Sequence, residues 1–191
     1  GALGDEVEYR RVEVVGPRVS GELLSYGVVG LICAILGILI YLWFRFELIY
    51  GVAAVVTVFH DTLITVGAFS LANKEVSLTV IAAILTLVGY SNNDTIVVFD
   101  RIREGLKHRE RGSIQSLMNT SINETLGRTI LTGGTTLLSI GALYFFGGAV
   151  LRDFSFAILV GILVGTYSSI FIAAPIVLWW SRLRGKSIRR E

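Results

Sequence analysis

Five long apolar stretches, with almost no charged residue inside them, constrain this chain more than any other feature. Each approaches the roughly 20 residues that an α-helix needs to cross a hydrocarbon core. Helices are the only open-chain structure that satisfies every backbone polar group in lipid. We therefore predict an all-α polytopic membrane protein. The predicted spans are Tyr26 to Phe44, Leu48 to Ala72, Val76 to Phe99, Thr129 to Val150 and Phe154 to Trp180.

The overall composition agrees with a lipid environment. Hydrophobic residues make up 53% of the chain and charged residues only 17%, whereas soluble domains carry about 25% charged residues. The single cysteine, Cys33, excludes a disulfide framework, and two scattered histidines do not form a metal site. We expect no enzyme activity, no cofactor, no metal and no binding of nucleic acid.

Short turns at 45–47, 72–75 and 151–153 are predicted to join antiparallel neighbours. Lys and Arg concentrate in a loop at 100–128 and in a tail at 182–191. Short loops rich in these residues stay on the cytoplasmic side, which predicts a non-cytoplasmic N-terminus. Three arginines near that terminus oppose this orientation: Arg10, Arg11 and Arg18.

The first 24 residues are expected to belong to a domain outside the membrane. The chain begins with Gly1 and has no signal sequence before Tyr26, so we interpret it as a fragment. The run EVEYRRVEVV, rich in Val and Tyr, predicts a last strand before the Gly16-Pro17 turn. The predicted organisation is a truncated outer domain at 1–24, a five-helix membrane domain at 25–181 and a basic tail at 182–191.

The segment LTLVGYSNNDTIVVFDRIRE, at 85–104, places a carboxylate inside a predicted span. On a helical wheel Thr86, Tyr90, Asn93 and Asp94 share one face, whereas Asn92 lies on the opposite, apolar stripe. An unpaired charge in lipid costs on the order of 3 kcal/mol, so we expect a functional role for Asp94. For Ser91, Asn92 and Thr95 we expect hydrogen bonds between helices.

Arg128 is the predicted partner of Asp94, because both lie near the cytoplasmic ends of adjacent spans. The pair is the minimum that a proton carrier needs, since the arginine keeps its charge while the carboxyl gains and loses a proton. An alternative for Arg128 is a side chain that reaches the membrane surface. A second pair, His60-Asp61, stands in mid-span and suits either proton exchange or a structural hydrogen bond.

Glycines predict close helix packing at two places. Gly161 and Gly165 form a GxxxG motif, and Gly133-Gly134 with Gly141 are expected to thin another helix.

Five blocks resemble the SecF family, in order and over nearly the whole chain. They are VVGPRVSGEL at 14–23, FHDTLITVGAFSL at 59–71, LTLVGYSNNDTIVVFDRIRE at 85–104, SINETLGRTILTGGTTLL at 121–138 and GILVGTYSSIFIAAPIVLWW at 161–180. SecF is the membrane partner of SecD in bacterial protein export, similar in architecture to resistance-nodulation-division transporters. The family normally has an apolar residue where Asn92 stands.

The resemblance implies a multi-pass protein of the bacterial inner membrane. Five of six implied helices would be present, as half of a pseudo-symmetric bundle that uses the proton-motive force to assist preprotein translocation and release on the periplasmic side. Asp94 matches the family's functional aspartate, Arg128 its functional arginine, and His60-Asp61 a recurrent pair of unsettled role. The implied partners are SecD (separate or fused), the SecYEG translocon, YajC and YidC, besides preprotein, protons and lipid.

Two further expectations remain open. The loop at 100–128 interleaves apolar and basic residues, which predicts an amphipathic helix on the inner membrane surface; its alternative is a docking surface for the translocon. The alternative function is half of a proton-driven exporter of small molecules or lipids, because an Asp and an Arg in a bundle indicate coupling without identifying the cargo.

Overall fold

The computed structural model describes residues 17–74, 77–107 and 113–183, and all of these fold as helices and short connections. Five continuous helical segments are long and apolar enough to cross a membrane, which confirms the all-α polytopic prediction. The strand predicted at 6–15 lies outside the described residues. The elements are α1 Pro17–Arg45, α2 Leu48–Leu71, α3 Leu78–Lys107, α4 Ile114–Phe146, α5 Gly148–Ser168, a π-helix Ser169–Ala173 and α6 Ala174–Leu183.

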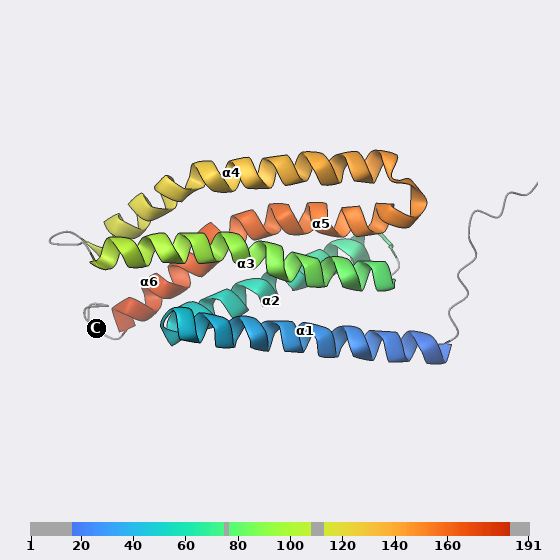
Figure 1. Ribbon diagram of the computed structural model, residues 1–191, viewed down its shortest axis with the longest axis horizontal. Helices are drawn as coiled ribbons and strands as arrows, with labels where there is room; N and C mark the ends of the chain where they lie inside the picture. The colour runs from blue at the N-terminus through green and yellow to red at the C-terminus, as the bar shows by residue number, and fades with distance from the viewer. Residues whose placement is uncertain (1–16, 75–76, 108–112, 184–191) are drawn as a thin grey trace, which may run out of the picture.

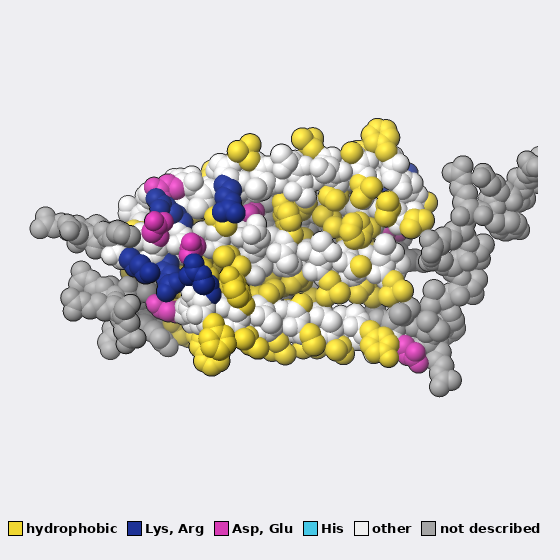
Figure 2. Space-filling model, in the orientation of Figure 1, with side chains coloured by type: hydrophobic (Ala, Val, Ile, Leu, Met, Phe, Trp, Pro, Cys, Tyr) yellow, Lys and Arg dark blue, Asp and Glu magenta, His cyan; other side chains and the backbone are white. Residues whose placement is uncertain are grey.

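The five spans run antiparallel to their neighbours in sequence, and α6 continues the direction of α5 (Figure 1). The α1–α2 and α3–α4 connections and the end of α6 lie at one end of the bundle, and the other two connections lie at the opposite end. Helices α1 and α4 form opposite edges, with α3 and α5 between them. On the face seen in Figure 2, charged side chains gather towards the end where α3 is followed by α4.

The connection between α4 and α5 differs from the prediction. The turn expected at 151–153 is wrong, because α4 already ends at Phe146 and α5 begins at Gly148. Gly148 has a φ of 77°, a left-handed conformation that glycine adopts without steric cost. The Gly147-Gly148 pair therefore makes the turn, and Arg152 and Asp153 lie within α5.

The last span contains a π-helix in place of a continuous α-helix. Pro175 is the second residue after the π-helix. A proline lacks a backbone N–H and its ring clashes with the carbonyl four residues earlier, so a wider turn just before it relieves both problems. The span predicted at 154–180 is therefore present but divided.

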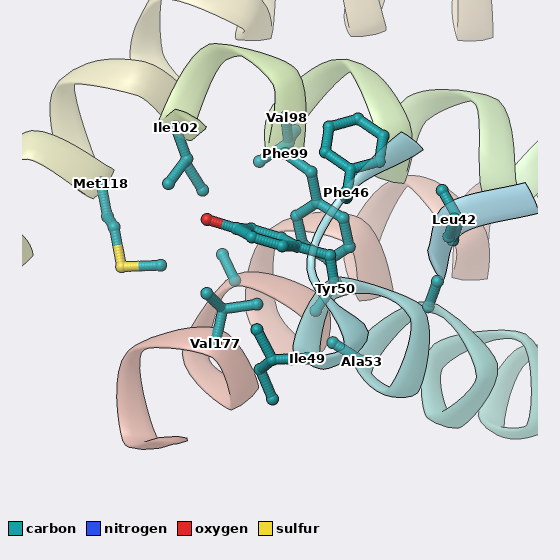
Figure 3. Packing of buried hydrophobic residues seen from close by; sticks show 13 residues of the cluster. Leu42, Phe46, Ile49, Tyr50, Ala53, Val98, Phe99, Ile102, Met118 and Val177 are labelled. Atoms are coloured by element: carbon teal, nitrogen blue, oxygen red, sulfur yellow. The ribbon is translucent and has the colours of Figure 1, made fainter. Parts of the chain in front are cut away.

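Two hydrophobic clusters hold the bundle together. In the Tyr50 cluster, the Tyr50 ring packs against Phe99 of α3 at a centroid distance of 5.1 Å (Figure 3). Its buried members are Leu42, Phe46, Ile49, Tyr50, Ala53, Ala54, Val98, Phe99, Ile102, Met118, Ala173, Ala174 and Val177. The Phe69 cluster consists of Phe69, Val80, Ala83, Ile84, Ala157, Ile158 and Ile162.

The segment predicted as an amphipathic surface helix is instead shared between the ends of α3 and α4. Its apolar side chains face the protein: Ile102 and Met118 are buried in the Tyr50 cluster, and Ile114 packs against it. Arg101 also joins the two helices, because its Nε lies 2.5 Å from Glu124 Oε2. The apolar side that the pattern assigned to lipid is thus covered by the bundle.

Candidate functional site

A layer of buried polar side chains separates the two hydrophobic clusters. Along each central helix it lies between residues of the Phe69 cluster and residues of the Tyr50 cluster. Buried polar groups in a membrane span cost free energy unless they are hydrogen-bonded, so such a layer is a candidate functional site. We call it the polar layer; it comprises Thr57, Asp61 and Thr65 of α2, Ser91, Asn92, Asp94 and Thr95 of α3, and Ser168 and Ser169 at the start of the π-helix.

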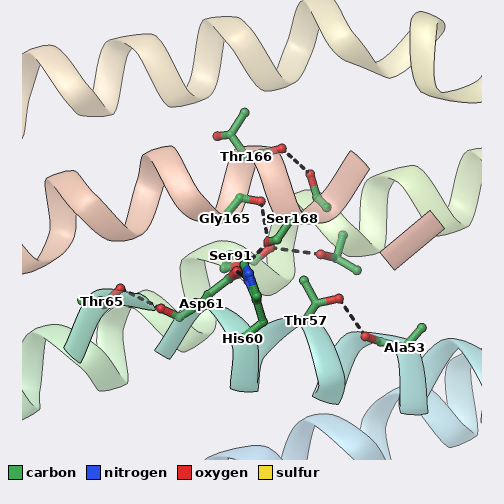
Figure 4. A network of polar contacts seen from close by, with 11 residues as sticks. Ala53, Thr57, His60, Asp61, Thr65, Ser91, Gly165, Thr166 and Ser168 are labelled. Atoms are coloured by element: carbon green, nitrogen blue, oxygen red, sulfur yellow. Dashed lines mark hydrogen bonds and ion pairs between the residues drawn. The ribbon is translucent and has the colours of Figure 1, made fainter. Parts of the chain in front are cut away.

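Asp61 is the most highly connected side chain of the layer (Figure 4). Its residue is only 1% exposed. Ser91 Oγ of α3 donates to Asp61 Oδ2 at 2.5 Å, and Ser168 Oγ of α5 donates to the same oxygen at 2.8 Å. The second oxygen, Oδ1, lies 3.0 Å from His60 Nδ1. Asp61 therefore links three helices. We call His60, Asp61, Ser91 and Ser168 the Asp61 cluster.

The predicted GxxxG motif lets α5 approach α3 at this level. A Cβ atom at Gly165 would lie 2.9 Å from Ser91 Oγ, and one at Gly161 would lie within the side chain of Leu87. The motif thus packs as predicted. On α4 the prediction holds for Gly133, which faces Thr166 of α5, but it is wrong for Gly134 and Gly141, whose added Cβ atoms would meet nothing within 4 Å in the described chain.

Asp94 lies in the same layer, one helical turn beyond Ser91. Its residue is 5% exposed, and in the part of the chain that the structure describes its carboxyl makes no hydrogen bond. Arg128 of α4 is near enough for its positive charge to act on Asp94. Among the described contacts the two side chains do not form a direct ion pair. The predicted pairing is therefore a longer-range electrostatic interaction. The guanidinium of Arg128 belongs to an exposed residue.

The predicted polar face of α3 divides into an inward and an outward part. The Tyr90 hydroxyl donates to Thr132 O and Thr136 Oγ1 of α4, both at 3.2 Å, and so joins the two helices. Thr86 donates to its own helix at Ala82 O, and Thr86 and Asn93 are exposed. The bundle therefore presents polar side chains on its outer surface at the depth of a membrane span.

Of the three predicted helix–helix hydrogen bonds, one is confirmed. Ser91 bonds α2 through Asp61. The Thr95 hydroxyl donates within its own helix, to Ser91 O at 3.4 Å, and Asn92 Oδ1 has no partner among the described residues although it is buried. Sequence reasoning missed Ser168. Its spacing held the signal, because residues 161, 165 and 168 fall on one helical face.

Comparisons with known proteins agree over nearly the whole chain. Residues 2–183 match the family model described as protein export membrane protein SecD/SecF, C-terminal. The chain is 58% identical over 176 residues to protein translocase subunit SecF of Koribacter versatilis, covering 92% of this chain and 44% of that relative. It is 57% identical over 180 residues to the SecF of Desulfurispirillum indicum, covering 93% of this chain and 57% of that relative.

Solved structures show the same likeness. The crystal structure of SecDF from Thermus thermophilus, a translocon-associated membrane protein, matches with a TM-score of 0.84 at 49% sequence identity. The match covers 88% of this chain and 23% of the SecDF chain. The chain spans about half the length of the curated relatives it matches.

Proposed function

Because this chain belongs to the SecF family of protein-export membrane proteins, we propose that it uses the proton-motive force to assist preprotein translocation. In this role it is the membrane-embedded part of a larger subunit and catalyses no covalent chemistry. It resides in the bacterial inner membrane. Its charged helix ends, seen together in Figure 2, lie in the cytoplasm, and its N-terminus lies in the periplasm.

One observation carries the proposal: Asp94 is a buried carboxyl in a membrane span without a hydrogen bond among the described residues. Within the described residues no hydrogen bond holds Asp94 in one charge state, and the Arg128 charge acts on its carboxyl. Moving one elementary charge through 100 mV makes about 2.3 kcal/mol available. That is enough to shift a two-state equilibrium about fifty-fold.

In the proposed cycle Asp94 takes up a proton from the periplasmic side and later releases it to the cytoplasm. Arg128 keeps its charge throughout, so the attraction between the two side chains changes with each proton. His60 and Asp61 form a second proton-coupling pair in the same layer. Tyr90 supplies a polar contact to α4, and the exposed Asn93 and Thr86 supply polar groups on the outer surface of α3.

The exposed polar side chains of α3 and α4 need a polar or water-lined surface opposite them. We propose that SecD, fused or separate, provides this surface and that the pair acts next to the SecYEG translocon on its preprotein. Contacts with YajC and YidC stay a prediction. The relatives are named protein translocase subunits, and no observation favours a small-molecule or lipid exporter.

Preprotein translocation into membrane vesicles that contain the full-length protein tests the proposal. The Asp94→Asn amide is nearly isosteric with the carboxyl but cannot carry a proton. We expect this variant to assemble normally and to lose the part of translocation that depends on the proton gradient.

Asp100→Asn is the matched control. Asp100 lies on the same helix, but it is exposed and paired with Arg45 at 2.9 Å. Its replacement should leave the response to the gradient intact. A full response in Asp94→Asn vesicles would exclude Asp94 as the coupling residue.

A further inference from the structure

We propose that Ser91 and Ser168 are positioning residues for Asp61, and that protonation of Asp61 switches Ser168 to another acceptor and loosens the π-helix. The inference deepens the proposed function, because it rests on Asp61 being one of the groups that bind protons. It links a change of protonation in the Asp61 cluster to a conformational change in the last span. The proposed roles of Asp94 and Arg128 do not include such a change.

The hydrogen-bond pattern at Asp61 carries the first step. Both hydroxyls donate to Oδ2, at 2.5 and 2.8 Å. A carboxylate oxygen has two lone-pair sites in its plane, so the two hydroxyls fill both. A proton that binds Oδ2 needs one of these sites. Protonation at this atom therefore ends one of the two donated hydrogen bonds.

Of the two donors, Ser168 has a second acceptor within hydrogen-bond distance. Its hydroxyl also lies 3.1 Å from Gly165 O, one turn earlier in α5. Ser91 Oγ has no second acceptor among the described contacts. In the switched state the new O–H bond is on Asp61, Ser168 keeps its own proton, and its hydroxyl donates to Gly165 O. The carboxyl is then neutral. Any contact that remains is an ordinary hydrogen bond, about half as strong as a charge-assisted one.

The position of Ser168 connects this switch to the backbone. Ser168 is the residue directly before the π-helix Ser169–Ala173, as Figure 4 shows with its contacts to Asp61 and Gly165. π-Helices are rare, and single π turns inside α-helices occur frequently at functional sites. Pro175 removes one further backbone donor on the other side of the π-helix. The Asp61 contact is therefore a major restraint at the point where the last span is least regular.

Charged groups other than His60 do not contact Asp61 in the described chain. On α3 the nearest along the sequence is Asp94, one turn beyond Ser91, and it makes no hydrogen bond with Asp61. The charged residues of the other helices that pack around α2 lie near helix ends: Glu22, Arg45, Arg152, Asp153 and Arg182. His60, whose side chain is 33% exposed, contacts the other oxygen, Oδ1, at 3.0 Å, so both in-plane sites of Oδ2 stay with the two serines until a proton binds there.

Paired spin labels at two exposed positions test the proposal: Leu63 of α2 and Phe171 of the π-helix. The full-length protein is reconstituted with Cys33→Ser and Asp94→Asn, so that Asp94 contributes no titration. The distance distribution between the labels is measured at high and at low pH. We expect it to broaden or to shift by about 1–2 Å at low pH, the size of helix shifts in switching proteins.

Three variants distinguish the proposed Asp61–Ser168 switch from other causes of a pH response. Asp61→Asn should abolish the pH response. Ser168→Ala should show, at high pH, the distribution that the parent shows at low pH. Ser169→Ala is the matched control, because Ser169 is equally buried but its hydroxyl bonds only Thr166 O at 3.0 Å; it should keep the pH response.

A parent without a pH response, or a Ser168→Ala variant that keeps the full response, overturns the inference. Neither result affects the role of Asp94 in the proposed function, which depends on whether Asp94→Asn vesicles lose gradient-dependent translocation. Conversely, a pH response of the labels can persist even where Asp94 is not the coupling residue. Each experiment can therefore contradict its own proposal without contradicting the other.

Discussion

At the scale of single residues, Asn92 is one of three described side chains with a buried polar atom that has no hydrogen-bond partner, together with Tyr50 and Ser155. It is 6% exposed, and its Oδ1 atom has no hydrogen-bond partner in the described chain. Leaving a buried polar atom unpaired costs about 1–3 kcal/mol, and replacing it by an apolar group of the same shape removes that cost. Asn92→Leu should therefore raise the free energy of unfolding by about 1–3 kcal/mol, measured by denaturant unfolding of the full-length protein in mixed micelles.

The control for this prediction is Asn92→Ala, which removes the unpaired atom but leaves a cavity. It should be less stable than Asn92→Leu. Gradient-dependent translocation should be unchanged in the leucine variant, because Asn92 makes no hydrogen bond to a proton-coupling residue among the described contacts. A loss of stability in Asn92→Leu would mean that Asn92 bonds a group outside the described chain.

The individual site residues differ in how far the sequence could predict them. Asp94, Arg128 and the His60-Asp61 pair stand out because a charge inside an apolar run is costly wherever the helix packs. Ser168 does not stand out by residue type, because an isolated serine or threonine in a membrane helix most often bonds its own backbone, as Thr57, Thr65 and Ser169 do here. Its place on the helix face of Gly161 and Gly165 was its signal in the sequence, and the meeting of α2, α3 and α5 shows that Ser168 and Ser91 bond the same carboxylate.

At the scale of helices, the contact between α3 and α5 is set by small residues. Gly161 faces Leu87, and a Cβ atom there would lie 2.2 Å from Leu87 Cδ1. Leu87 is fully buried and has little room to move. Gly161→Ala should therefore separate the helices and lower the free energy of unfolding by about 1–3 kcal/mol, the usual cost of overpacking.

Gly134→Ala provides the comparison in the same unfolding experiment. Gly134 also lies within a membrane helix, yet an added Cβ atom would meet nothing within 4 Å among the described residues. Its replacement should be neutral or stabilising by up to about 1 kcal/mol, because alanine is the better helix former. Equal losses at both positions would contradict close packing as the role of Gly161.

The sequence predicted which helices exist better than it predicted where each helix ends. Length and apolarity determine that five spans exist, but they do not say where a helix stops once it leaves lipid. Helices α3 and α4 continue past the predicted ends because Ile102 and Met118 find a core to pack into. The α4–α5 turn depends on the φ of Gly148, which a hydropathy pattern does not register.

At the scale of the whole molecule, exposed apolar and polar side chains are unevenly distributed over the outer surface of the bundle. Helix α2 exposes large apolar side chains such as Phe59 and Leu63, which suit lipid. Helices α3 and α4 also expose Thr86, Asn93 and Arg128, which do not suit lipid, beside apolar side chains such as Ile130 and Leu131. The two kinds of surface predict that one side of the bundle faces lipid and another faces protein or water.

Cysteine cross-linking in native membranes tests this division. With Cys33 replaced by serine, Asn93→Cys should form a cross-link to the SecD part of the complex, whether SecD is a separate chain or fused. Phe59→Cys, equally within a span but on the apolar side, should not. Cross-links from both positions, or from Phe59→Cys alone, would contradict the proposed orientation of the bundle.

Because of the π-helix, the number of residues in the last span helps to determine which way the residues of α6 face. Each residue of a helix rotates the chain by about 100°. If Ser169–Ala173 became a regular α-helix with every residue kept, everything after it would turn by about that angle, because a π turn holds about one residue more than an α turn. Ala174 and Val177 would then leave the Tyr50 cluster while the Asp61 contact stayed in place. The π-helix therefore absorbs one residue and keeps these two contacts in register, so a one-residue deletion within Ser169–Ala173 should be tolerated better than the same deletion within the regular helices α5 or α6.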